Sequence, residues 1–134
     1  MSIFEDTAPR AVRHEPLRVT VLGASGSVGM QTLDVCRHFP QKVEVAALAV
    51  RSSVEFAVKA ATEFNCKYVA FADASVKGNA LLDSLPQGCK ASFGPEAVQA
   101  LAELDEVDCV VNAVVGEAGI YAGLAAVKAG KVLA

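Results

Sequence analysis

The sequence predicts an α/β protein, a Rossmann-like doubly wound and mainly parallel sheet. From position 17 onward, short apolar runs alternate with stretches whose apolar residues recur at helical spacing. The apolar runs are continuous, which is typical of parallel strands that helices cover on both faces. The first run also ends in a glycine-rich turn that leads into a helical pattern, as in nucleotide-binding βα units. These three observations place residues 17–134 in one α/β domain.

The first strand is predicted at residues 19–22, where a run of β-forming residues stops at Gly23. A helix follows the glycines, and its apolar positions include Val28, Leu33, Val35 and Cys36. We expect this helix to end near His38, because a cation suits the negative end of the helix dipole and Pro40 cannot continue the helix.

The second strand is predicted at residues 43–49 and the second helix at 54–64, with Ser52 or Ser53 as its cap. One stripe of that helix carries Phe56, Ala57, Ala60, Ala61 and Phe64. A third strand is expected at residues 68–72, since this run is again short and apolar.

The second half of the chain continues the alternation. The expected elements are a helix from Asp73 or Ser75 to about Leu85, a strand at 90–93, a helix from Pro95 to about Leu104, a strand at 107–111, a helix at 120–129 and a strand at 131–134. In a doubly wound sheet the ligand lies outside the carboxyl ends of the strands, at the switch point beside the first strand. The loop at 114–119 leaves a strand at that end and should border the same crevice.

Length and composition narrow the possible functions. With 134 residues, 53% of them hydrophobic, the chain can build one core but is small for a complete oxidoreductase. The net charge of −3 gives no electrostatic reason to expect nucleic acid or an anionic membrane as a partner. No apolar run approaches the roughly 20 residues that span a bilayer. Residues 1–16 lack a signal-peptide core, so we expect a flexible leader and a cytoplasmic protein.

The metal-ligating residue types form no recognisable motif. No two of the cysteines form a C-x-x-C pair, and the chain has two histidines. We therefore predict reduced core cysteines, no metal site and no catalytic residue within the chain. The acidic residues at 105–108 are predicted to lie in a solvated loop, and Asp34 on the surface of the first helix. The cysteines are Cys36, Cys66, Cys89 and Cys109.

The glycine-rich turn predicts a phosphate-binding site. A helix start leaves backbone N–H groups unpaired and carries the positive end of the dipole, so an anion fits there without a basic side chain. Gly23 can adopt the turn dihedrals, Gly26 can let a phosphate approach the backbone, and Gly29 can let helix and strand pack closely. Ser25 and Ser27 add hydroxyl donors. The spacing is G-x-x-G-x-x-G rather than the usual G-x-G-x-x-G.

The end of the second strand favours NADP over NAD. NAD-binding domains usually place an acidic residue there for the ribose 2′-hydroxyl, but this chain has Ala49. Arg51, Ser52 and Ser53 follow, and a guanidinium with two hydroxyls suits a 2′-phosphate.

Three segments of the chain together resemble one family. LRVTVLGASGSVGMQTLDVCRHFP resembles the amino-terminal segment of 1-deoxy-D-xylulose 5-phosphate reductoisomerases, where a GSTGSIG loop leads into a helix with a TLDV stretch. VEVAALAV resembles the second strand of that family, and VDCVVNAVVGEAGIYAGLAAVKAGKVLA resembles its NAIVGAAG segment and the helix that follows. The resemblance implies an NADPH-dependent enzyme that needs a divalent metal, Mg or Mn. Its members rearrange and reduce 1-deoxy-D-xylulose 5-phosphate to 2-C-methyl-D-erythritol 4-phosphate, in the non-mevalonate route to isoprenoids.

The resemblance also implies roles for particular residues. The NADPH pyrophosphate would be lined by Ser25, Gly26, Ser27 and Val28, and the nicotinamide by Ala113, Val114 and Val115. The family's G-K/R-N element falls on Arg51-Ser52-Ser53, where the glycine and asparagine are absent and the basic residue is displaced by one. Glu117 stands where a small or apolar residue is commoner.

The family's catalytic part has no counterpart in these residues. Its Asn-Lys-Glu motif, metal-binding carboxylates, phosphate-binding residues and lid come after the position that matches Ala134. We therefore expect an NADPH-binding domain of a longer enzyme, without turnover by itself. The full-length enzyme would bind a sugar-phosphate substrate and form a homodimer.

Two other interpretations are open from the sequence. The NADPH domain of a semialdehyde or acyl-phosphate reductase begins with a similar G-A-S-G-x-x-G turn and uses a cysteine from a later domain. A non-catalytic module that binds a nucleotide or coenzyme A would have the same fold.

Overall fold

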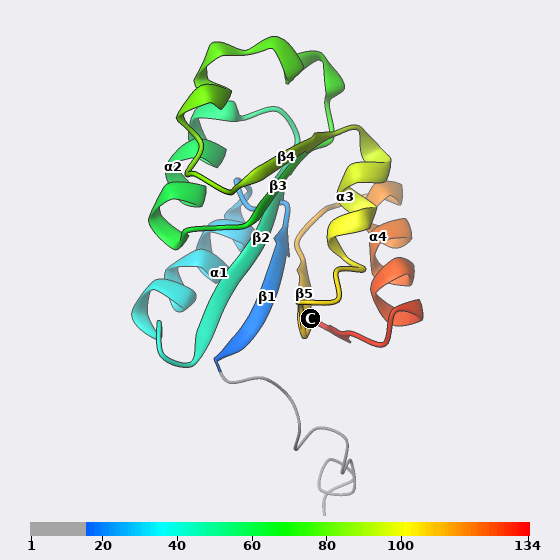
Figure 1. Ribbon diagram of the computed structural model, residues 1–134. Coiled ribbons are helices and arrows are strands. Elements are labelled where there is room, and N and C mark those ends of the chain that lie inside the picture. The colour runs from blue at the N-terminus through cyan, green and yellow to red at the C-terminus, as the bar shows by residue number, and fades with distance from the viewer. Residues whose placement is uncertain (1–15) are drawn as a thin grey trace, which may run out of the picture.

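The computed structural model describes residues 16–134 as a six-stranded parallel sheet between two layers of helices (Figure 1). The strands are β1 (Leu17–Leu22), β2 (Val43–Val50), β3 (Tyr68–Phe71), β4 (Lys90–Phe93), β5 (Cys109–Asn112) and β6 (Val132–Leu133). The helices are α1 (Ser27–His38), α2 (Val54–Phe64), α3 (Pro95–Leu101) and α4 (Glu117–Lys128). The predicted fold class is confirmed. Residues 1–15 of the predicted leader lie outside the described residues.

The two faces of the sheet have separate cores. In Figure 1, α1 and α2 cover one face, and α3 and α4 cover the other. The residues of β2 are divided between them: Val45, Leu48 and Val50 pack on the α1–α2 side, and Ala46, Ala47 and Ala49 on the α3–α4 side. The alternation is interrupted at Ala46 and Ala47, where the register between β1 and β2 shifts. Burial on both faces explains why β2 is a continuous apolar run. Among residues 16–134, the fully buried polar residue is Thr20, whose hydroxyl donates to the Leu101 carbonyl at 2.9 Å.

The strand order is β4-β3-β2-β1-β5-β6. β2, β3 and β4 are added in turn on one side of β1, and β5 and β6 on the other side, so the order of the strands reverses at β1. β1 and β5 lie side by side in parallel register, with Leu22 opposite Asn112. Their carboxyl ends therefore deliver two loops to the same point, the position where open α/β sheets bind ligands. The expected switch point beside the first strand is confirmed.

The segment after β3 differs from the prediction. Instead of one α-helix, it forms two 3₁₀ helices, η2 (Ala74–Gly78) and η3 (Ala80–Ser84). Asp73 accepts a hydrogen bond from the Ser75 N–H, and Asn79 accepts one from the Leu81 N–H. Because the second of these bonds begins a new turn within the predicted helix, the segment is split in two.

Several boundaries and surfaces also differ. α3 ends at Leu101, before the predicted Leu104, and α4 begins at Glu117, before the predicted Ile120. Val28 and Val35 of α1 are 58% and 55% exposed, so they are not core positions. Ser53 is the N-cap residue of α2, but its side chain makes no capping hydrogen bond.

The acidic residues before β5 are structural partners rather than a freely solvated loop. Asp108 accepts a hydrogen bond from the Arg18 N–H at 3.0 Å, and Glu106 accepts one from the Tyr68 hydroxyl at 2.6 Å. The prediction for Asp34 is confirmed, since its side chain is exposed and paired with Arg37 on the surface of α1.

The four cysteines are free thiols, as predicted; Cys36, Cys66 and Cys109 are buried in the core as expected, whereas Cys89 is only half-buried. Burial raises the pKa of Cys36 and Cys89, and that of Cys66 to about 12. Such thiols are poor nucleophiles at neutral pH. None of the helices found in residues 16–134 has the length and apolar character needed to cross a membrane.

Candidate functional site: a cleft at the switch point

The turn after β1 is held tightly against its neighbours. Gly23 has φ +75°, a left-handed conformation that favours glycine. The N–H groups of Gly23 and Ala24 both donate to the Ala49 carbonyl, at 3.0 and 2.9 Å. A Cβ atom on Gly29 would overlap the Gly23 carbonyl oxygen and lie 2.7 Å from the Ala24 Cα. The close helix–strand packing expected of Gly29 is therefore present.

α1 begins without any side chain over its N-terminus. Its N-cap residue is Gly26, no side chain accepts from its first-turn amides, and its first turn has no acidic residue. Gly26 has φ −78°, which any residue can adopt, and a Cβ there would lie 3.5 Å from the nearest described protein atom. The protein itself does not require glycine at this position. A glycine here leaves room for a group that approaches the backbone from outside.

The loop after β5 has a similar construction. Gly116 has φ +81° and is the N-cap residue of α4, and a Cβ on Gly119 would overlap the Val114 carbonyl oxygen. The two loops also touch each other, because a Cβ on Gly23 would lie 2.9 Å from the Ala113 carbonyl. Two helices whose N-cap residues are glycines therefore begin close together, at the carboxyl ends of β1 and β5.

A cleft of about 570 Å³ opens between these loops. Of the residues that the sequence singled out, its lining includes Gly23, Ser25, Gly26, Arg51, Ala113, Val114 and Val115. The expectation that the loop at 114–119 borders the same crevice as the β1–α1 turn is confirmed.

Four of the singled-out residues do not line the cleft. Ser27 borders a separate hollow between α1 and α2, and Val28 is exposed on α1. Ser52 and Ser53 are exposed at the start of α2, beside Arg51. Gly26, the N-cap residue of α1, still lines the cleft, but the side chains of Ser27 and Val28 point elsewhere on that helix.

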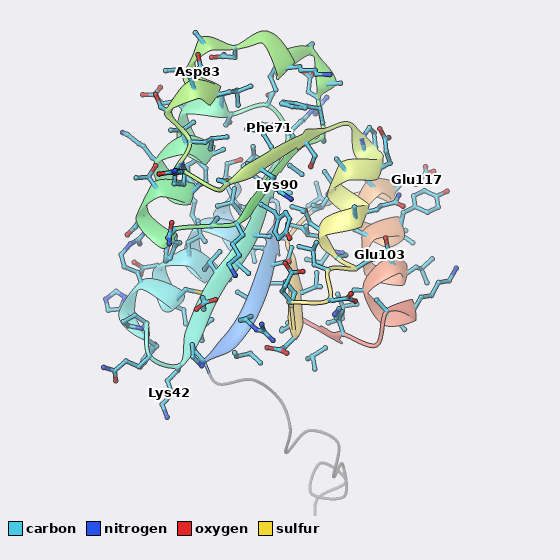
Figure 2. The ribbon with its side chains drawn as sticks, in the orientation of Figure 1. Lys42, Phe71, Asp83, Lys90, Glu103 and Glu117 are labelled. Carbon is cyan, nitrogen blue, oxygen red and sulfur yellow. The ribbon has the colours of Figure 1, made fainter. Side chains whose placement is uncertain are left out.

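The cleft also has a wall that the sequence analysis did not identify. Pro95, Val98 and Gln99 of α3 line it, together with Ala72 at the end of β3 and Tyr121 of α4. The Tyr121 hydroxyl donates to a Glu117 carboxylate oxygen at 3.2 Å, and Glu117 lies at the start of α4 (Figure 2). The one-turn spacing from Glu117 to Tyr121 is the signal that could have placed this tyrosine at the cleft.

Among the described lining residues, Arg51 and Glu117 are the charged ones, at different parts of the cleft. Asp73 lies near Arg51; hydrogen bonds from Ser75 lower the pKa of its carboxyl, and Arg51 contributes to a smaller extent. In residues 16–134, no three His, Cys, Asp or Glu side chains gather as metal ligands would. The cleft therefore combines the uncapped start of α1, one guanidinium, one carboxylate and a mostly apolar wall.

The sequence profile of the family described as 1-deoxy-D-xylulose 5-phosphate reductoisomerase matches residues 19–134. The reductoisomerase of Photorhabdus laumondii is 43% identical over 117 residues, which are 85% of this chain and 29% of that protein. The one from Cellvibrio japonicus is 38% identical over 118 residues, 87% of this chain and 30% of that protein. The chain thus spans about 29% of the length of these curated relatives.

Solved structures agree with the sequence match. The Zymomonas mobilis reductoisomerase in complex with NADPH superposes with a TM-score of 0.81 at 36% identity, over 89% of this chain and 31% of that chain. A DOX-P reductoisomerase in complex with NADPH, fosmidomycin and magnesium gives a TM-score of 0.77 at 31% identity, over 87% of this chain and 29% of that chain. An NAD-binding oxidoreductase from Klebsiella pneumoniae, at 18% identity and a TM-score of 0.54, shows a shared fold alone.

Proposed function

The chain belongs to the 1-deoxy-D-xylulose 5-phosphate reductoisomerase family, and on this premise we propose that residues 17–134 are the NADPH-binding domain of such an enzyme. The observation that supports this most strongly is the uncapped start of α1 at the rim of the cleft. The first-turn N–H groups and the positive helix end there suit a diphosphate. The space above Gly26, which the protein does not need for itself, fits the approach of that group.

The adenosine end of the cofactor is assigned to the side of the cleft that contains Arg51. This guanidinium lies at the end of β2, where Ala49 replaces the carboxylate that would repel a 2′-phosphate. Ser52 and Ser53 follow on the same exposed turn and can add hydroxyl donors. The proposal is a 2′-phosphate held mainly by Arg51, so the domain prefers NADPH to NADH.

The nicotinamide end is assigned to Ala113, Val114 and Val115. These residues are small or apolar and continue the cleft from the Gly23 turn. When bound, NADPH supplies a hydride. The part of the chain described here would hold and orient the cofactor and exclude water from one side of it.

The activity of the whole protein is also part of the proposal. In a longer chain, this domain would serve the rearrangement and reduction of 1-deoxy-D-xylulose 5-phosphate to 2-C-methyl-D-erythritol 4-phosphate, in the cytoplasm and as a homodimer. The sugar phosphate and the divalent metal would be bound by residues outside the described ones, since no metal-ligand cluster is found in residues 16–134.

A calorimetric titration of the chain with NADPH, NADH and coenzyme A tests the proposal. We expect one NADPH per chain, weaker binding of NADH and no competition by coenzyme A. Equal affinity for NADPH and NADH would overturn the 2′-phosphate assignment, and preferred binding of coenzyme A would favour the non-catalytic module. Family membership already favours the reductoisomerase over the semialdehyde reductase.

A further inference from the structure

We infer that Asn112 is a positioning residue, which holds the loop at 113–119 in the shape that receives the nicotinamide end of the cofactor. This inference rests on the proposed function, because the loop matters only if NADPH lies against it. Asn112 does not line the cleft itself. It would act through the backbone of Val114 and Gly119.

The carboxamide of Asn112 is bonded to both ends of the loop. Its Nδ2 donates to the Gly119 carbonyl at 2.7 Å, and its Oδ1 accepts from the Val114 N–H at 3.3 Å. One side chain therefore links Val114, the second residue after β5, to the first turn of α4. The bonds require a donor and an acceptor on the same planar group, which asparagine has and leucine or ionised aspartate lacks.

Asn112 is itself well anchored. It is the last residue of β5 and lies in register with Leu22 of β1. Its backbone N–H donates to the Ala134 carbonyl at 2.9 Å. A Cβ on Gly123 would lie 3.4 Å from Nδ2, so α4 packs directly on the carboxamide. The side chain that holds the loop is thus fixed in place by the central strands and by α4.

A displacement of the loop would also change its contact with the β1–α1 turn on the other side of the cleft. A Cβ on Gly23 would lie 2.9 Å from the Ala113 carbonyl and 3.1 Å from the Val114 nitrogen, so the loop is closely packed against the β1–α1 turn. Val114 and Val115 also line the cleft. Without the bonds from Asn112, the backbone that faces the nicotinamide would be free to shift relative to the backbone that faces the diphosphate.

Replacement of Asn112 by aspartate provides a pH-dependent test. A carboxylate can still accept from the Val114 N–H, but it faces the Gly119 carbonyl without a proton to donate. Protonation restores an O–H donor and makes the side chain a near copy of asparagine. Asn79→Asp is the matched control, because the Asn79 side chain is bonded as an acceptor to the Leu81 N–H, a role that a carboxylate can fill.

The experiment measures the dissociation constant of NADP⁺, which is stable in acid, from pH 8 to pH 4.5 for each variant and the wild type. At pH 8 we expect Asn112→Asp to bind about tenfold more weakly than the wild type, the loss of one hydrogen bond. The ratio should return toward one as the pH falls. Asn112→Leu should lose affinity equally at every pH, and Asn79→Asp should match the wild type throughout.

Two results would overturn the inference. One is a ratio near one for Asn112→Asp at pH 8, and the other is an equal loss at every pH with a lowered melting temperature, which indicates a merely structural role. If the wild type binds no NADP⁺, the proposed function fails instead. NMR spectra of the ligand-free protein then test whether Asn112 holds the loop. The Val114 and Gly119 amide signals of Asn112→Asp should move to the wild-type positions on acidification. Signals that do not move would contradict the inference.

Discussion

Gly29 is the glycine at which an added Cβ atom would make the shortest contact. A methyl group there would overlap the Gly23 carbonyl oxygen and press on the Ala24 backbone, neither of which is a flexible side-chain end. We predict that Gly29→Ala destabilises the fold by about 2–3 kcal/mol, the cost of overpacking a rigid site. It should also weaken NADPH binding, because α1 must shift from the turn.

Gly78→Ala is the control for this change, since a Cβ at Gly78 meets nothing within 4 Å. Urea unfolding of both variants measures the free-energy difference. Wild-type stability in Gly29→Ala would show that the turn and α1 are not packed as described.

Arg51 carries the prediction of cofactor selectivity. Arg51→Ala should weaken NADPH binding by tenfold or more while leaving NADH binding nearly unchanged, because a charge-assisted contact to a phosphate contributes about 1.5–3 kcal/mol. Lys59→Ala removes an exposed positive charge from α2 and serves as the control. Equal losses for both cofactors would refute the assignment of Arg51 to the 2′-phosphate.

At this scale, the sequence predicted what single glycines must do but not where side chains point. The constraints on Gly23 and Gly29 follow from the turn, and the structure has them. Ser27 and Val28 lie beside the cleft in sequence, but the rotation of α1 turns their side chains away from its lining. The cofactor contacts of all these residues stay predictions.

At the scale of elements, α1 and α2 are joined by an ion pair. The Arg37 guanidinium bonds both carboxylate oxygens of Glu63, and the hydrogen bonds hold the pKa of Glu63 below its ordinary value of 4.5. A lowered folded-state pKa stabilises the fold above the unfolded pKa, and this contribution is lost as the pH falls through the lowered value.

We therefore predict that Glu63→Gln is slightly less stable than the wild type at pH 7, and that this difference in unfolding free energy disappears as the pH falls through the lowered folded-state pKa of Glu63. High salt should reduce the difference at pH 7, because the pair is exposed. Urea unfolding at a series of pH values from 7 downward measures the difference, with Glu103→Gln as a control away from this pair (Figure 2). A difference that stays constant over the whole pH series would assign the effect to packing instead.

The accuracy of the predicted elements depended on how many residues share each signal. α2 has the predicted bounds, since five apolar residues form one stripe between clear ends. The segment after β3 lacks such a stripe, and two side-chain hydrogen bonds at Asp73 and Asn79 decide its conformation. Local bonds of this kind compete with the helix and leave no periodic trace in the sequence.

At the scale of the whole molecule, the parallel architecture could be predicted because the runs that form β2, β3 and β5 are largely apolar without polar alternation. The order of the strands is a tertiary property, and the sequence indicated it only through the glycine turn that marks the switch point at β1. The α3 wall of the cleft, with Pro95 and Gln99, comes from that order. No local sequence pattern predicts that α3 lines the cleft.

The whole chain should bind the cofactor without turning over substrate. With 1-deoxy-D-xylulose 5-phosphate, Mg²⁺ and NADPH present, we expect no loss of NADPH absorbance, because the chain spans about 29% of the length of its curated relatives. Oxidation of NADPH that depends on both metal and substrate would contradict this expectation.

The position of bound NADPH tests the central claim most directly. A crystal structure of the chain with NADPH should show the diphosphate within hydrogen-bond distance of the backbone N–H groups at the start of α1, above Gly26. The 2′-phosphate should lie beside Arg51 and the nicotinamide against residues 113–115. Cofactor density at any other surface, with the cleft at the β1–β5 switch point empty, would contradict the account.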